Sequence, residues 1–424
     1  MRKNIYDKDF GYDILKPIVD WNLKHSYRKV EVRGMENVPA DGAIIVAPNH
    51  CNTLMDALVI LRAFDNETVF GARADMFNNA FVAKLMYFIR ILPMVRQRDG
   101  LRNVLKNYET QEIIVDTLKN KVRFCMFPEG RHRPAHSLQT LGKGTFRAAL
   151  AANAAFGEQM PVYIVPTGIE YGDYFRFRST SLVTFGKAIN VTETVKELNL
   201  ENEAQIMDHL RKELTARMSE LITYLPYDEN YDAKWALTKV RALDFKGSLY
   251  DKMMNNRAII ADINSACETD PEKMAKLLDK AAAFEKARRK EGVSIYSFRK
   301  KNLALSVVGK GLAAVLGLPY LIFSGIVALP MWSIAEFLRN KIRDKAFRNT
   351  AIFGVKLAGN LIFGLIYAIL AFCILPWPWA LAFLTLAGPA YSYIYDYAEF
   401  FRRWISDIKL LGNKKLQKMF AKLY

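Results

Sequence analysis

The sequence predicts an α/β domain that is followed by a helical hairpin and by C-terminal membrane helices. Three observations lead to this prediction. Strand-like runs alternate with helical patterns in the first half of the chain, charge-rich helical patterns follow, and apolar runs of membrane length come last. We place the boundaries at 1–225, 226–300 and 301–424, in a chain of 424 residues that is long enough for two or more folded units.

The amino terminus shows no resemblance to a signal peptide. Its first residues, MRKNIYDKDFGYD, are charged throughout and lack an apolar core, so we expect the first domain to stay on the cytoplasmic side. Segment 11–27 mixes apolar residues with Lys16, Lys24 and His25 in the pattern of an amphipathic helix. That helix could rest on a membrane surface or pack against the domain core, and the pattern fits both.

The stretch NHCNTLMD at 49–56 places a histidine and a carboxylate on one turn. His50 follows the buried strand expected at Ala43–Ala47 and precedes an apolar helical pattern. An imidazole with a pKa near ~6.5 can take a proton from a substrate hydroxyl, and Asp56 behind it can fix the tautomer, so that no serine nucleophile is needed. The alternative is structural, because Thr53 with Asp56 also fits a helix-capping pattern.

Two further stretches end strand-like runs with arginines, ILPMVRQR at 91–98 and FPEGRHRP at 127–134. Arginine presents a planar fork of donors that matches phosphate oxygens. Glu129 and the glycine after it suggest a tight turn whose carboxylate holds an arginine or a substrate hydroxyl. For Arg98 and Arg133 a solvated basic loop is the favoured interpretation.

Four blocks in this order resemble the glycerol-phosphate acyltransferase family, which includes the lysophosphatidic acid acyltransferases. The blocks are His50 with Asp56; LPMVR ending in Arg96; Phe127, Pro128, Glu129, Gly130 and Arg131; and VYIVPTGI with Pro166. The segments VRGMENVPADGAIIVAPNH at 32–50 and LGKGTFRAAL at 141–150 also look like this family. The resemblance covers roughly residues 28–225, and the joint occurrence of the blocks is far more specific than any one of them.

The sequence departs from the commoner family members at two places. Five residues separate His50 from Asp56, where the commoner members have four. This spacing resembles a branch that acylates glycerol phosphate or related acceptors. Arg131 and His132 stand where many members have threonine and arginine. Both departures concern the identity of the acceptor more than the reaction.

The resemblance implies an acyltransferase domain with a mixed central sheet flanked by helices. It implies transfer of a fatty acyl group from acyl-CoA or acyl carrier protein to a hydroxyl of glycerol 3-phosphate or its 1-acyl derivative, with no cofactor beyond the acyl donor. The site residues that follow are catalytic His50 and Asp56, phosphate-binding Arg96 and Arg131, and Glu129 and Gly130 shaping the acceptor site.

The charge distribution favours a membrane over nucleic acid as the partner. The net charge is +17, and residues 298–424 hold 17 basic against 5 acidic side chains. The same stretch contains the two long uncharged apolar runs, Gly311–Trp332 and Leu357–Tyr395. Since a spanning helix needs about 20 apolar residues, we expect an integral membrane protein whose catalytic domain faces the cytoplasm.

The second apolar run is long enough for a helical hairpin, with its break at Pro376 and Pro378. Basic clusters flank both ends of each apolar unit, which is the cytoplasmic signature. The segment 303–338 therefore cannot be one simple span, and Pro319 suggests two short helices, a re-entrant hairpin or an element along one leaflet. The alternative is a buried helix pair of a soluble protein.

The middle of the chain reads as a hairpin of two helices. Asp270 before Pro271 is a helix-start signal and Gly292 is a helix stop, while a second helical pattern runs over 253–268. We assign no chemical role to this hairpin.

Neither the cysteines nor the histidines indicate a metal site. Cys51, Cys125, Cys267 and Cys373 are scattered without disulfide or ligand spacing, which indicates reduced surroundings. Although His132 and His136 have helical i, i+4 spacing, Pro134 between them disfavours that helix. A thiol nucleophile at Cys51 is unnecessary if the substrate supplies the attacking hydroxyl.

Other functions remain open from the sequence alone. An acyltransferase could use another lysolipid as acceptor, and a membrane tether could keep the fold without turnover. A transporter with a regulatory soluble half is disfavoured by the few apolar spans and by the absence of charge across 357–395.

Overall fold

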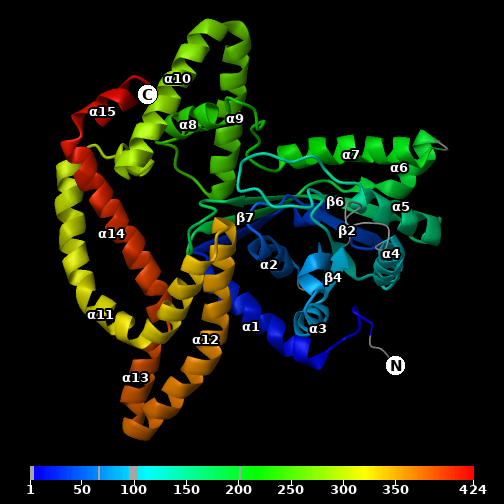
Figure 1. Cartoon of the computed structure of the whole chain (residues 1–424), viewed down its shortest axis with the longest axis horizontal. Helices are drawn as coiled ribbons and strands as arrows, with labels where there is room; N and C mark the ends of the chain where they lie inside the picture. The colour runs from blue at the N-terminus through cyan, green and yellow to red at the C-terminus, as the bar shows by residue number, and fades with distance from the viewer. Residues whose placement is uncertain (1–3, 65–66, 95–103, 200–201) are drawn as a thin grey trace. The chain divides into compact units, whose positions relative to one another are not determined.

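The computed structural model describes residues 4–64, 67–94, 104–199 and 202–424. The chain divides into two compact units (Figure 1). Unit 1 comprises residues 1–174 and 179–224, and unit 2 comprises 175–178 and 225–424. The predicted class, an α/β domain with a mixed sheet and helices followed by a helical region, is confirmed.

Unit 1 is built on a sheet of eight strands within the described residues, in the order β1-β7-β6-β2-β5-β3-β4 with β8 beside β6. The strands are β1 (Lys29–Arg33), β2 (Ala43–Pro48), β3 (Thr68–Arg73), β4 (Ile91–Met94), β5 (Arg123–Cys125), β6 (Val162–Tyr171), β7 (Thr180–Phe185) and β8 (Ile189–Asn190). Neighbouring strands are parallel except where β6 meets β7 and β8.

Helices cover both faces of this sheet. They are α1 (Phe10–Ser26), α2 (Leu54–Ala63), α3 (Ala80–Phe88), α4 (Val104–Lys119), α5 (Gly144–Phe156), α6 (Val191–Leu198) and α7 (Glu203–Glu220). Alternate residues of β2, Ala43, Ile45 and Ala47, join the apolar core with α4, α5 and α7. Because side chains alternate along a strand, the residues between them point to the other face, on which α2 packs against β7.

The helix α1 is amphipathic, as the pattern of its sequence indicates. Tyr12 and Leu23 are buried, whereas Phe10, Ile14 and Trp21 are exposed. The helix therefore packs one face on unit 1 and leaves apolar side chains on the other. The core-packing alternative is confirmed for the buried face, and the membrane-surface alternative stays a prediction.

Unit 2 opens with the expected hairpin, formed by α9 (Leu249–Thr269) and α10 (Pro271–Glu291) after α8 (Tyr231–Arg241). Asp270 caps α10 by accepting from the Lys273 N–H, and Gly292 ends it in a left-handed conformation with φ +66°. Both signals predicted from the sequence are confirmed. These helices share an apolar core with α15 (Lys414–Ala421), so that 226–300 packs together with the C-terminal region.

The apolar part of unit 2 contains α11 (Leu303–Lys341), α12 (Lys345–Ile374), α13 (Trp377–Ala387) and α14 (Ala390–Gly412). Two of them, α11 and α12, are long and apolar enough to cross a membrane by length and composition. Only 17% and 11% of their most apolar windows is buried, unlike core helices of a soluble protein. The break expected at the prolines is present, since α12 ends at Ile374 and α13 begins at Trp377.

For the segment 303–338, the alternative of two separate short helices is wrong, whereas a re-entrant hairpin and an element along one leaflet stay predictions. The segment is part of one continuous helix that keeps both Pro319 and Pro330 inside, and Figure 1 shows that this helix bends sharply along its length. A proline removes one backbone hydrogen bond and kinks a helix without ending it where neighbouring helices support the chain. That support comes from α14, which packs along α11.

Candidate active site

Three strands carry the candidate residues to one edge of the sheet in unit 1. His50 follows β2, Glu129 follows β5, and Tyr171 is the last residue of β6. Since β2 runs parallel to both β5 and β6, the carboxyl ends of these strands meet at the same edge. This is where open α/β sheets place their ligands.

His50 and Asp56 form a close pair. His50 Nδ1 lies 2.8 Å from Asp56 Oδ2, the carboxylate is fully buried, and the imidazole is 18% exposed. A buried carboxylate is an acceptor, so we assign the proton on Nδ1 to this bond. Nε2 is then left with a lone pair on a partly exposed ring, which is the arrangement of a general base.

The imidazole is held between aromatic rings. It stacks on Phe127 with ring centroids 4.2 Å apart, and His132 lies edge-on at 5.7 Å. Both neighbours belong to the loop after β5. This loop therefore fixes the orientation of the ring that the strand-to-helix turn after β2 presents.

Asp56 contacts His50 and also accepts hydrogen bonds from backbone N–H groups of the turn before α2. Its Oδ2 accepts from the backbone N–H of Cys51 at 2.8 Å and of Asn52 at 2.7 Å, in addition to His50. The capping pattern with Thr53 is absent, because Thr53 has φ +50° and makes no side-chain capping bond. The backbone bonds anchor the carboxylate, and an anchored carboxylate holds the imidazole more firmly.

Glu129 joins the two loops of the site. Oε1 accepts the His50 backbone N–H at 2.8 Å, and Oε2 accepts both the backbone N–H and the side-chain amide of Gln139 at 3.0 Å. Burial raises the pKa of the Glu129 carboxyl. A second link in the same place is the bond from the Arg133 N–H to the His50 carbonyl at 2.9 Å. In the structure Glu129 thus contacts the protein's own loops.

Gly130 and Arg131 lie on the exposed turn after Glu129. Gly130 has φ +65°, a conformation that favours glycine, and a side chain there would meet nothing within 4 Å. Arg131 donates from Nε to Gln139 Oε1 at 2.7 Å. This bond directs the exposed guanidinium along the same loop that carries Glu129.

Arg96 and Arg98 lie outside the described residues, as does the rest of 95–103. The structure describes β4 up to Met94, and β4 runs parallel to β3, which runs parallel to β5. The strand β4 therefore ends at the same edge of the sheet as the other candidate residues.

Two side chains of the site were not singled out from the sequence. The Tyr171 hydroxyl donates to Asp56 Oδ1 at 2.8 Å across 115 residues of sequence, and Gln139 bridges Glu129 and Arg131. A tyrosine at a strand end and a glutamine in a loop carry no motif of their own. The one available signal for Tyr171 was its place two residues after the fourth family block.

The cysteines and remaining histidines give no second chemistry here. Cys51 is buried, and burial together with the Asp56 charge raises its thiol pKa well above the usual value, which disfavours a thiolate nucleophile. His136 Nδ1 lies 3.2 Å from the Tyr174 hydroxyl and 3.4 Å from Glu170. Among the described residues no three His, Cys, Asp or Glu side chains form a possible metal-binding group.

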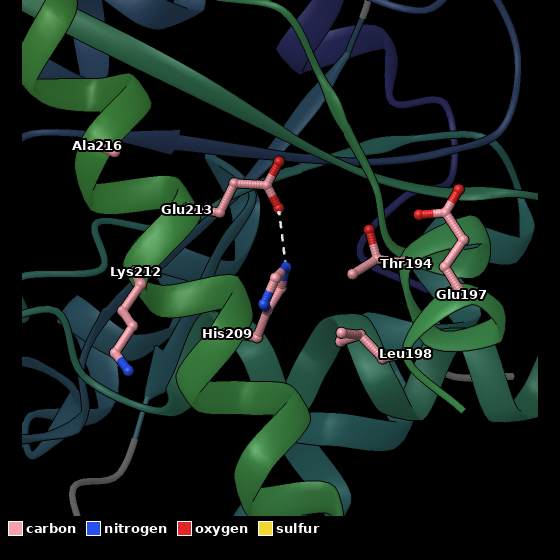
Figure 2. A pocket seen from close by; sticks show the side chains of 7 residues that line it. All are labelled: Thr194, Glu197, Leu198, His209, Lys212, Glu213 and Ala216. Carbon is pink, nitrogen blue, oxygen red and sulfur yellow. Dashed lines mark ion pairs between the residues drawn. The ribbon is translucent and has the colours of Figure 1, made fainter. Parts of the chain in front are cut away.

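A separate groove of about 560 Å³ lies between α6 and α7 (Figure 2). It is lined by Thr194, Glu197, Leu198, His209, Lys212, Glu213 and Ala216. His209 Nε2 lies 3.9 Å from Glu213 Oε2. The groove contains none of the residues predicted for the site, and its lining is that of two packed surface helices.

Comparison with known proteins supports the family resemblance of the N-terminal part of the chain. The sequence model of the Acyltransferase family matches residues 29–170. Glycerol-3-phosphate O-acyltransferase 2 of Saccharomyces cerevisiae is 28% identical over 139 residues, which cover 33% of this chain and 18% of that protein. An uncharacterised protein of Mycobacterium bovis is 27% identical over 154 residues, covering 34% of this chain and 39% of its own length. The chain thus spans well under half the length of these relatives.

A solved structure also matches. The 1-acyl-sn-glycerophosphate (LPA) acyltransferase of Thermotoga maritima is 18% identical, with a TM-score of 0.36 over 52% of this chain and 83% of that chain. The matched family model and the yeast relative confirm, for residues 29–170, the resemblance that the sequence blocks indicated.

Proposed function

We propose that this protein, whose residues 29–170 match the Acyltransferase family model, transfers a fatty acyl group from a thioester to a hydroxyl of glycerol 3-phosphate or 1-acylglycerol 3-phosphate. The product would be a phospholipid precursor. The observation that carries the proposal is the His50–Asp56 pair, with a buried carboxylate on Nδ1 and a partly exposed imidazole at the carboxyl edge of the sheet.

The proposed chemistry uses the acceptor as its own nucleophile. His50 Nε2 takes the proton from the acceptor hydroxyl as that oxygen attacks the thioester carbonyl. The new C–O bond forms, the C–S bond breaks, and the imidazolium returns the proton to the leaving thiolate. Asp56 stabilises the imidazolium between the two proton transfers. No protein nucleophile is consumed, which agrees with the raised pKa of the Cys51 thiol.

The acceptor phosphate needs fixed positive charge, and we propose Arg131 and Arg96 for this role. Arg131 is exposed on the loop whose other residues hold His50. A guanidinium can make two parallel bonds to phosphate oxygens. Glu129 and Gly130 would shape the acceptor site through this loop, with Glu129 acting on the backbone of His50 and of Gln139.

We further propose that the protein is an integral membrane protein with unit 1 on the cytoplasmic side. Support comes from the length, apolar composition and low burial of α11 and α12, and from the basic residues that flank them, such as Arg339, Lys341, Arg343 and Lys345. An acyl chain or a lysolipid could then react without leaving the bilayer. Retention in the pellet after salt and carbonate washing would support this, and release by salt alone would refute it.

The deciding experiment is an acceptor panel. Purified protein is incubated with labelled acyl-CoA or labelled acyl carrier protein and with glycerol 3-phosphate, its 1-acyl derivative or neutral lysolipids. We expect labelled product with a phosphate-bearing acceptor and none with His50→Ala, since loss of a general base costs at least about 10²-fold. The exposed His209 on α7 supplies the matched control, and His209→Ala should transfer at the wild-type rate.

Each outcome of the panel has a distinct meaning. Transfer only to neutral lysolipids would show that the acceptor is a neutral lysolipid and not a phosphate-bearing molecule, and it would contradict the proposed role of Arg131. Transfer that survives in His50→Ala would refute the general-base mechanism. If the folded wild-type protein releases no thiol with any acceptor, the chain is a membrane protein that keeps the fold without turnover.

A further inference from the structure

The carboxylate of Asp56 receives donors on both oxygens, and the two oxygens have different partners. Oδ2 faces His50 Nδ1 and two backbone N–H groups. Oδ1 faces the Tyr171 hydroxyl at 2.8 Å and the Cys51 thiol at 3.7 Å. A thiol is a weak donor. The phenol of Tyr171 is therefore the main donor to the oxygen that does not contact His50.

Tyr171 is held rigidly for this contact. The side chain is buried at the end of β6, where its ring stacks on Tyr27 with centroids 5.9 Å apart and meets Tyr174 edge-on at 6.1 Å. Burial and the adjacent Asp56 charge raise the pKa of the Tyr171 hydroxyl well above its usual value. The hydroxyl consequently keeps its proton at neutral pH and acts as a donor.

We infer that Tyr171 is a positioning residue for the His50–Asp56 pair, fixing the carboxylate and moderating its pull on the His50 imidazolium. The inference rests on the proposed function of the pair as a general base. A donor on Oδ1 withdraws charge from the carboxylate, and a bond to the charged form of an acid stabilises that form. Without it, more of the negative charge bears on His50, and the carboxylate loses one of its fixed contacts.

Removing the hydroxyl therefore has two expected effects. The imidazolium becomes more stable, so that the midpoint measured for His50 should move to higher pH, and the looser carboxylate holds the ring less well. The rate constant kcat should fall about tenfold or more, while the KM for the acceptor changes little because the Tyr171 side chain is buried. A residue needed only for packing would not shift the titration of His50.

Several other titratable groups surround the pair. They are Glu129 at the His50 backbone, His132 beside the ring, Cys51 beside Asp56, and Tyr27 and Glu170 farther out. Tyr27 also forms a side-chain hydrogen bond with Tyr171. The substitution Tyr171→Phe changes none of these residues and removes only the Tyr171 oxygen, so a shift at His50 is ascribed to the loss of that oxygen and of its hydrogen bonds.

The test compares Tyr171→Phe with Tyr174→Phe in the full-length protein in detergent or nanodiscs. Tyr174 offers a matched control, because its ring contacts Tyr171 and its hydroxyl bonds His136 instead of Asp56. The pH dependence of kcat/KM is measured for each. In Tyr171→Phe alone, we expect the acidic limb of the kcat/KM profile to move to higher pH and kcat to fall. Equal profiles for the two variants and wild type would overturn the inference.

A second readout does not depend on turnover. Diethyl pyrocarbonate modifies neutral imidazole, so the pH midpoint of modification at His50, followed by peptide mass spectrometry, reports its titration directly. Exposed His209 on α7 serves as the internal reference. The His50 midpoint should rise in Tyr171→Phe and stay fixed in Tyr174→Phe. If wild type transfers no acyl group and the midpoint still rises, the positioning role stands and the proposed function fails.

Replacement of Tyr171 by 3-fluorotyrosine provides the opposite perturbation in case Tyr171→Phe does not fold. The ring keeps its shape and its phenol becomes a stronger donor, so the His50 midpoint should fall below that of wild type. A midpoint that stays fixed or rises would contradict the inference.

Discussion

Asp56→Asn tests the electrostatic core of the proposed mechanism with little change in shape. The structure indicates that an amide can occupy the site. Its oxygen can take the place of Oδ2, where His50 Nδ1 and two backbone N–H groups donate. Its NH₂ group then faces the Tyr171 oxygen, which can accept a bond after the hydroxyl rotates. The fold and the resting imidazole should therefore survive the substitution.

What the substitution removes is the charge that stabilises the imidazolium. Two unit charges about 4 Å apart interact by about 4 kcal/mol at an effective dielectric constant of about 20. His50 Nδ1 and Asp56 Oδ2 are in hydrogen-bond contact at 2.8 Å, and Asp56 is fully buried, so solvent screens this pair poorly. A transition state that forms the imidazolium should therefore lose about 4 kcal/mol, or about a thousandfold in kcat.

The assay is transfer of labelled acyl groups under saturating acceptor, together with thermal unfolding of the same preparation. Asp208→Asn on α7 is the matched control, because this exposed aspartate pairs only with neighbours on its own helix in the described contacts. The reasoning is refuted if folded Asp56→Asn keeps kcat within tenfold of wild type. A thousandfold loss with an unfolded protein would show that the carboxylate is needed for the fold instead.

Three other changes have distinct expected outcomes. Arg131→Ala should raise the KM for a phosphate-bearing acceptor about tenfold or more with a smaller change in kcat, and an unchanged KM would make Arg131 structural. Glu129→Gln should lower kcat more than it raises KM, measured in the same assay, because the amide cannot accept from both His50 and Gln139. In unit 2, burial alone would raise the pKa of Glu285, but hydrogen bonds and charges from Arg288 and Lys239 hold it well below the ordinary value. A depressed pKa stabilises the fold above the unfolded value near ~4.3 and loses that stability as pH falls through the folded one. Glu285→Gln should thus lower the free energy of unfolding by about 3 kcal/mol at pH 7 and flatten the dependence of the thermal unfolding midpoint on pH between pH 5 and 2. If the variant shows the same pH dependence as wild type, this cluster is not the source of the acid sensitivity.

The parts of the site that could be predicted from the sequence are local in the chain. His50 and Asp56 are six residues apart across one strand-to-helix turn, so their contact follows from a single local element. The helix signals at Asp270 and Gly292 have the same character, since a cap depends on residues three or four positions away. The phosphate-binding roles of Arg131 and of Arg96, which lies outside the described residues, stay predictions.

The parts that could not be predicted depend on which strands are neighbours. Glu129 reaches the His50 backbone only because β5 lies beside β2, and Tyr171 reaches Asp56 only because β6 lies on the other side of β2. Hydropathy patterns locate strands without ordering them in a sheet. The continuity of α11 across Pro319 could not be predicted for a related reason, since the proline is a local breaking signal and the packing of α14 that supports the helix is not local.

The position of Asp56 between β2 and β6 also explains how one carboxylate can serve both the fold and the proposed reaction. Its Oδ2 accepts from the backbone of the turn after β2, which presents His50, and its Oδ1 accepts from the Tyr171 hydroxyl at the end of β6. A carboxylate with a single partner could rotate and lose the imidazole. With donors on both oxygens its orientation is set before any substrate arrives, and preorganised charge of this kind needs no rearrangement when the imidazolium forms.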